Sequence, residues 1–251
     1  SSLVGYFILL VSLPLAITGI IDDKVGLKST IRYGFQVVTS IFILSLLNKI
    51  DLSNTVSILY TLFLIFLSTA IINIINFMDG LDGLVTLSMI IFFLIMAISY
   101  SSIYLILLFS LIPFLFYNWS PSRVFMGDIG STFLGAIVFA AIIDRNSFTE
   151  SFSLLTILSP LLLDASICIL RRLSKGENIF TPHKLHLYQR LHQAKFSHQK
   201  VSLIFNAAII FLGILFFTRN IYLLCLGASF ILFLGIFLDF KYAVPFNKVI
   251  S

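Results

Sequence analysis

Long apolar runs alternate with short polar breaks along the whole chain. A helix that crosses a membrane needs about 20 predominantly apolar residues, and we predict nine such spans, three of them short, together with two tight helical hairpins. The spans are expected at 3–21, 32–48, 55–75, 84–99, 102–117, 131–144, 152–173, 202–218 and 221–238. The runs lack the alternation of apolar and polar residues that barrel strands show. The predicted fold class is therefore all-α, a polytopic transmembrane helical bundle.

Composition excludes a soluble protein. Hydrophobic residues make up 59% of the 251 residues and charged residues only 11%, whereas soluble domains carry about 25% charge. The longest polar stretch, 174–202, is too short to build a core of its own, so we expect residues 1–251 to form a single integral membrane domain. Cys168 and Cys225 both lie in apolar runs and are expected to be small buried side chains, neither a disulfide nor a metal site.

The basic residues are distributed unevenly between the two predicted sides. Thirteen of the 16 Lys and Arg residues lie on the side that follows the first span, and only Lys49, Arg145 and Arg219 lie on the other. Basic residues concentrate on the cytoplasmic side of membrane proteins. We therefore expect an outside N-terminus, a cytoplasmic C-terminus and residence in the bacterial inner membrane, with lipid and not nucleic acid as the surroundings.

Acidic residues cluster at three polar breaks on that same cytoplasmic side. Five of the eleven Asp and Glu residues are Asp22, Asp23, Asp79, Asp82 and Asp128. A carboxylate at the edge of a hydrocarbon span is costly unless it is paired, solvated or bound to a cation. Two adjacent acids at a helix C-terminus also oppose the helix dipole. The pattern favours one shared site that holds a divalent metal and a diphosphate.

Two of the breaks have further features of a ligand site. Asn73, Asn76, Asp79 and Asp82 recur every three residues, so they can line one strip of a helix; plain loop polarity is the alternative. In the segment 125–131, Asp128 stands between glycines before a predicted helix start, where backbone N–H groups can cradle a phosphate, and Phe125 could stack on a base.

A basic stretch at 181–190 contains two histidines three residues apart, His183 and His186, together with Lys184 and Arg190. Phosphate binding explains this composition best. Zinc binding is an alternative for which no third ligand is evident, and a positive-inside loop explains only the cations. His192 and His198 are expected to be solvated. Asp164, alone within a span, is expected to have either a structural or a catalytic role.

Taken together, the chain resembles the polyprenyl-phosphate N-acetylhexosamine-1-phosphate transferases of glycosyltransferase family 4. Four segments carry the resemblance, in this order: DDKVG, NIINFMDGLDGL, FMGDIGS and HKLH. Members of that family transfer a sugar-1-phosphate from a UDP-N-acetyl sugar to undecaprenyl phosphate and release UMP. The PHKLHLYQRL stretch is most similar to the branch that starts O-antigen synthesis with N-acetylated deoxysugars.

The resemblance implies a role for each motif residue. Asp128, with Asn76, would bind Mg²⁺ or alternatively Mn²⁺, and Asp22 and Asp23 would lie near the polyprenyl phosphate, one of them deprotonating or positioning it. The residues expected to contact the nucleotide sugar or its phosphates are Asn73, Asn76, Asp79, Asp82, Phe125, His183, Lys184, His186 and Arg190.

Relatives of this kind usually carry two further N-terminal spans, and the chain starts without Met. We therefore expect an N-terminally truncated member, for which an inactive, binding-only role is one alternative. A secondary transporter is another, although it should show internal repeats and acids near the midplane. A CDP-alcohol phosphotransferase is a third, but the arginine and spacing of its motif are missing. A homodimer is one compatible assembly.

Overall fold

The computed structural model describes residues 2–178 and 183–248, except for the side chains of residues 2–4, 23 and 248. In these ranges the chain forms eleven α-helices, one short 3₁₀ helix and no strand. The helices are α1 Ser2–Val25, α2 Ser29–Leu46, α3 Thr55–Met78, α4 Leu84–Ser99, α5 Tyr104–Asn118, α6 Gly127–Ile143, α7 Phe148–Ile157, α8 Ser159–Ser174, α9 Leu187–Gln193, α10 His198–Phe217 and α11 Ile221–Lys241. The predicted all-α class is confirmed.

Apolar length and surface identify a multi-pass membrane protein. Five helices (α1, α2, α3, α10 and α11) are long and apolar enough to cross a bilayer, and α7 with α8 forms a sixth, broken candidate. Three shorter apolar helices, α4, α5 and α6, accompany them. On α11 only Leu224 and Gly227 are buried, so most of its apolar side chains face outward, as lipid contact requires.

The span predicted at 152–173 is not one straight helix. The chain bends by 79° between α7 and α8, and Pro160 lies in the first turn of α8. Proline fits the first turn of a helix because its missing N–H is not needed there, but it cannot continue a preceding helix. The apolar composition predicted one helix because hydrophobicity does not show where the axis turns. The short helix α9 was also not predicted.

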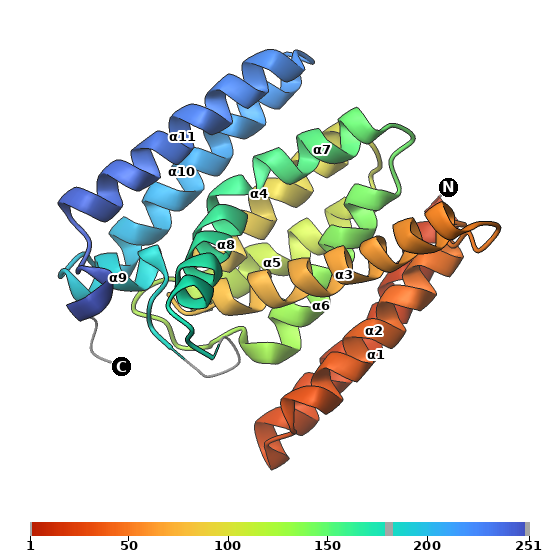
Figure 1. Ribbon diagram of the computed structural model, residues 1–251, viewed down its shortest axis with the longest axis horizontal. Helices are drawn as coiled ribbons and strands as arrows, with labels where there is room; N and C mark the ends of the chain where they lie inside the picture. The colour runs from red at the N-terminus through yellow and green to blue at the C-terminus, as the bar shows by residue number, and fades with distance from the viewer. Residues whose placement is uncertain (1, 179–182, 249–251) are drawn as a thin grey trace.

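Helix α6 lies at the centre of the bundle, between α1 and α3, and Figure 1 shows the α1–α2 pair and the α10–α11 pair on opposite sides of it. Two glycines permit the close packing. A Cβ on Gly19 would come within 2.6 Å of the backbone of Ile129, and one on Gly135 within 2.8 Å of the Cα of Ile72. Such contacts are sterically forbidden, so glycine at these positions lets the α1, α3 and α6 backbones approach closely.

Candidate active site

The acidic motifs meet where α1 and α3 end and α6 begins. Asp22 lies in the last turn of α1, Asn76 in the last turn of α3, and Asp79 follows α3 directly. Asp128 lies in the first turn of α6, just after Gly127, whose φ of +62° few other residues adopt. The Gly19 contact brings the end of α1 against the start of α6, so residues more than 100 positions apart become neighbours.

Arg32 joins two of the acids. Its Nη1 atom lies 2.9 Å from Oδ2 of Asp22 and 2.5 Å from Oδ2 of Asp128. The other oxygen of Asp22 accepts a hydrogen bond of 2.6 Å from the backbone N–H of Leu27, and Gly26, with a φ of +68°, makes the turn that returns the chain into α2. One guanidinium therefore neutralises part of a cluster that holds two carboxylates at close range.

The remaining oxygen of Asp128 is held by α3. Asn76 donates from Nδ2 to Asp128 Oδ1 over 2.8 Å and to Ser131 Oγ over 2.9 Å. Ser131 in turn donates to the carbonyl oxygen of Gly127 over 2.7 Å. Both oxygens of Asp128 therefore have partners that fix the carboxylate in one orientation.

Asp79 adds a third carboxyl group to the cluster. Burial raises the pKa of Asp79 to about 8, and the negative charge of Asp128 adds to the rise, while the backbone of Gly127 acts in the opposite direction. Asp79 is therefore largely protonated at neutral pH. A cation beside Asp79 and Asp128 would reverse both effects by favouring the ionised carboxylate.

Asn73 and Asp82, from the same three-residue pattern, have other partners. Asn73 exchanges side-chain hydrogen bonds of 2.7 and 3.2 Å with Gln36 of α2. Asp82 accepts from Ser122 Oγ over 2.9 Å, and its Oδ2 lies 3.0 Å from His198 Nδ1. Burial opposes ionisation of Asp82, but Ser122 and His198 lower its pKa below the usual value. The four residues therefore do not all face one ligand.

The expectation of a solvated His198 is wrong, because the loop after α3 meets the start of α10 and His198 pairs with Asp82. His192 is exposed, as expected, and its Nε2 lies 3.3 Å from that of His198. Phe125 and Lys184 are also exposed. The side chain of Asp23 lies outside the described part of the structure.

Arg190 is buried, and protein groups occupy its guanidinium. It donates to the carbonyl oxygens of Leu185 and Val244, each over 3.0 Å, and pairs with Asp239 at 2.5 Å. These bonds fasten α9 to the end of α11. These contacts of Arg190 are with protein groups that hold α9 and α11 together, so they are structural.

Asp164 also makes structural contacts. Its two oxygens accept the backbone N–H groups of Leu187 and Tyr188 over 2.7 and 3.1 Å. These N–H groups belong to the first turn of α9 and have no partner within that helix. Asp164 therefore caps α9 from α8, which accounts for an acid within an apolar run.

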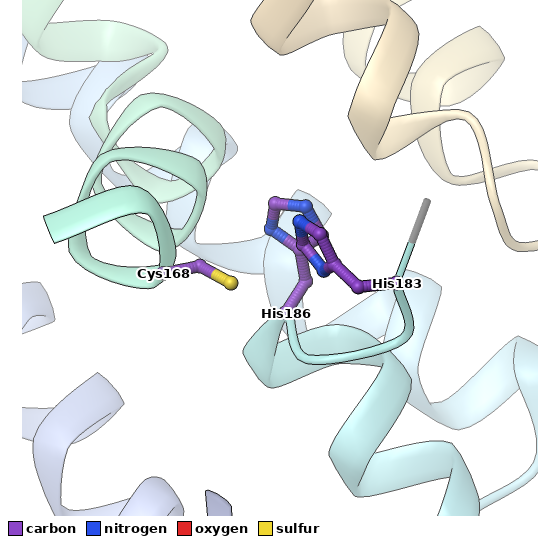
Figure 2. A group of neighbouring side chains, drawn as sticks. All are labelled: Cys168, His183 and His186. Atoms are coloured by element: carbon purple, nitrogen blue, oxygen red, sulfur yellow. The ribbon is translucent and has the colours of Figure 1, made fainter. Parts of the chain in front are cut away.

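The two histidines of the HKLH segment lie beside a cysteine. Figure 2 shows His183 and His186 facing Cys168 of α8, and one donor atom from each residue lies within 4.8 Å of the others. Cys168 is buried and unpaired with another cysteine, as expected, but its position beside the two histidines was not expected. Cys168 is 15 residues before His183 in the sequence, and their spacing did not predict that they lie close together.

The histidine segment packs against the end of α3, next to the acids. Tyr188 donates from its hydroxyl group to the carbonyl oxygen of Phe77 over 2.8 Å, and the His186 ring centroid is 6.3 Å from that of Phe77. Gly80 leaves room for the Tyr188 hydroxyl, with which a Cβ at that position would collide. The fourth sequence motif thus adjoins the site without donating a side chain to the acidic cluster.

The fold and the cluster define a multi-pass membrane protein with an acidic site at one end of its helices. A family model described as "Glycosyl transferase family 4" matches residues 6–146. The chain belongs to this family. The match contains the whole acidic cluster, while the histidine segment lies beyond it.

Three bacterial relatives illustrate the similarity. A "Probable undecaprenyl-phosphate N-acetylglucosaminyl 1-phosphate transferase" of Bacillus subtilis is 34% identical over 104 residues, which cover 39% of this chain and 28% of that protein. Two proteins named "Decaprenyl-phosphate N-acetylglucosaminephosphotransferase" match similarly. The one from Mycobacterium leprae is 33% identical over 38% of this chain and 28% of its own length. The one from Mycobacterium tuberculosis H37Rv is 35% identical over 36% and 26%. The matched segments thus span little more than a quarter of each relative.

Proposed function

We propose that the chain transfers a sugar-1-phosphate from a UDP-N-acetylhexosamine, or an N-acetylated deoxyhexose, to undecaprenyl phosphate and releases UMP. The observation that carries the proposal is the junction of Asp22, Asp128 and Arg32 at the ends of α1, α6 and α2. It places two carboxylates and a guanidinium together beside apolar helices. A phosphate on a lipid and a diphosphate on a nucleotide both need such a site at a membrane edge.

The donor atoms of the cluster fit Mg²⁺. The carboxylates of Asp22, Asp79 and Asp128 are hard oxygen ligands, and hard divalent cations prefer carboxylate oxygens. Burial is the main cause of the raised pKa of Asp79 and the charge of Asp128 adds to it, and a bound cation would oppose both effects. Asp128 and Asp79 would hold the ion, with Mn²⁺ as an alternative. When bound, Mg²⁺ would neutralise the diphosphate and stabilise the departing UMP.

The remaining residues would bind and position the two substrates. Arg32 is 39% exposed at its side chain, so its guanidinium can contact a phosphate from solvent or from the bilayer surface. Asp22 lies beside it and would position the lipid phosphate, one oxygen of which attacks the β-phosphorus of the UDP-sugar. The bond between that phosphorus and the UMP oxygen breaks. Asn76 would keep Asp128 oriented throughout, because it bonds the oxygen that Arg32 does not reach.

The proposed site faces the cytoplasm of a bacterial inner membrane. The support is the concentration of Lys and Arg on the side that carries the acidic motifs. Nucleotide sugars are supplied on that side, so the product would initiate a cell-envelope glycan such as an O-antigen.

Membranes that contain the protein test the reaction class. They are incubated with undecaprenyl phosphate and UDP-GlcNAc labelled at the β-phosphate. The proposal predicts that the label moves to the lipid and that UMP is released, that EDTA stops the transfer, and that Mg²⁺ or Mn²⁺ restores it. Release of UDP, or transfer that EDTA does not affect, would contradict the proposal.

A further inference from the structure

We propose that Cys168, His183 and His186 form a zinc site that fastens the HKLH segment to α8. The three residues each offer one ligand atom, and these atoms all lie within 4.8 Å of one another. Ligand atoms around tetrahedral zinc, bound at about 2.1 to 2.3 Å, are separated by about 3.5 Å. The set therefore needs to contract by only about 1 Å, which rotation of the side chains can supply.

The ligand types select zinc over the cation proposed for the acidic cluster. Thiolate sulfur and imidazole nitrogen suit Zn²⁺, whereas Mg²⁺ takes oxygen ligands. The two sites would thus bind different metals within one protein. Three protein ligands leave the fourth position of a tetrahedral ion to water or another donor.

His186 supplies a second, independent observation. It is only 2% exposed, and its Nδ1 atom has no hydrogen-bond partner. A buried polar atom without a partner is costly. That atom lies 3.8 Å from Oδ1 of Asp164. If Nε2 binds the metal, Nδ1 carries the proton and can turn toward this carboxylate, the usual support of a metal-bound histidine.

The ring of His183 is partly buried and its centroid lies 5.0 Å from that of the His186 ring. Its Nδ1 accepts a long hydrogen bond of 3.3 Å from the backbone N–H of Leu185. Zinc binding would replace this weak bond and would release the thiol proton of Cys168 to solvent.

The position on α8 explains what the site would do. Asp164 and Cys168 are four residues apart on α8 and so share a face. Asp164 already caps α9, and a metal at Cys168 would fix the segment that leads into α9. Tyr188, which follows this segment, packs on the end of α3. A structural zinc ion would therefore fix the HKLH segment beside the acidic cluster.

Metal analysis of the whole chain, purified in detergent with a tag that contains no histidine, tests the zinc site. After equilibration with Zn²⁺ and removal of loosely bound metal, we expect about one zinc per chain, because the three ligands form one site. Replacing zinc with Co²⁺ should give a thiolate-to-cobalt charge-transfer band. Both signals should disappear in Cys168→Ser and persist in the matched control Cys225→Ser.

Two more variants keep the test decisive. His183→Ala, in a partly buried segment outside the helices, should lose the metal even if Cys168→Ser fails to fold. Asp128→Asn should keep it, which separates this site from the acidic cluster. Absence of zinc from the wild-type chain, or equal loss in Cys225→Ser, would overturn the proposal. None of these readouts requires turnover, so the result does not depend on the proposed transferase reaction.

Discussion

Asn76 donates a hydrogen bond of 2.8 Å from Nδ2 to Oδ1 of Asp128, and this bond links the last turn of α3 to the first turn of α6. The two residues are 52 positions apart. The bond leaves Oδ2 of Asp128 to Arg32, so Asn76 fixes the direction in which the carboxylate presents its charge. The relationship makes Asn76 a positioning residue for the acid that we propose as the main metal ligand.

Asn76→Ala should therefore lower sugar-phosphate transfer by about 10- to 100-fold, the usual effect of removing a residue that orients a metal ligand. Asn54→Ala is the matched control, because Asn54 caps the other end of α3 through Ser57 N–H. The control should lose about 1 kcal/mol of stability and keep its turnover. Equal transfer rates in the two variants would remove Asn76 from the site.

The close approach of α1 to α6 should tolerate no side chain at Gly19. In Gly19→Ala the new Cβ would lie 2.6 Å from backbone atoms of Ile129, so the helices must separate and move Asp22 from Asp128. We expect a loss of about 1–3 kcal/mol of stability, as overpacking typically causes, together with most of the activity.

Gly34→Ala is the control for this change. Gly34 lies inside α2, and no atom lies within 4 Å of the position that a Cβ would take there, so alanine should be neutral or slightly stabilising. Thermal unfolding in detergent and turnover of both variants give the comparison. A Gly19→Ala protein as stable and active as Gly34→Ala would show that the helix contact is not needed.

The high pKa of Asp79 predicts a pH dependence in the absence of divalent ions. The pKa rises from 3.8 to about 8 on folding, so the folded state holds the proton more tightly than the unfolded state. Stability in EDTA should therefore fall as the pH rises from about 4 to 8. Mg²⁺ should bind more tightly as the pH approaches 8, because binding displaces that proton.

Asp79→Asn keeps the shape of the side chain but cannot ionise. It should flatten both pH profiles, as measured by thermal unfolding with EDTA and by Mg²⁺ titration between pH 6 and 8. Unchanged slopes in the variant would mean that another group controls them.

Cysteine labelling in intact cells tests the proposed orientation. In a background with Cys168 and Cys225 replaced by Ser, Lys24→Cys and Lys184→Cys should be protected from an impermeant reagent, and Arg219→Cys should react. The reason is the uneven distribution of basic residues. Labelling of Lys24→Cys from outside would reverse the topology.

The sequence predicted the helices well because each apolar run must satisfy its backbone internally in lipid. It missed the bend at Leu158, since apolar residues stand on both sides of Pro160 and do not show where the helix axis turns. The predicted spans also placed Asp22, Asp79 and Asp128 correctly at one end of the helical bundle, because each of these residues follows an alternate span. Their approach to one another depends on Gly19, whose role appears only when α1 and α6 are packed.

The partners of the polar side chains were harder to predict. Arg32 is one of many basic residues on the predicted cytoplasmic side, and the turn at Gly26 directs the chain so that Arg32 meets Asp22. Asp82 and Arg190 have motif spacing similar to that of binding residues, yet they pair with His198 and Asp239. Spacing along one segment gives no information about which distant helix supplies a partner.

If Asp128 is the main charge of the proposed active site, substitutions at the two ends of α6 should differ sharply in effect. Turnover and its Mg²⁺ dependence are measured side by side for Asp128→Asn and Asp144→Asn. Asp144, at the C-terminal end of α6, is exposed and pairs with Arg145 at 2.8 Å. Asparagine keeps the shape of aspartate but removes the charge a hard cation needs, and each 1.36 kcal/mol of lost transition-state stabilisation is about tenfold in rate. We expect Asp128→Asn to lose several orders of magnitude in turnover while it stays folded, and Asp144→Asn to remain near wild type. Near-normal, Mg²⁺-dependent turnover in Asp128→Asn would contradict this role of Asp128.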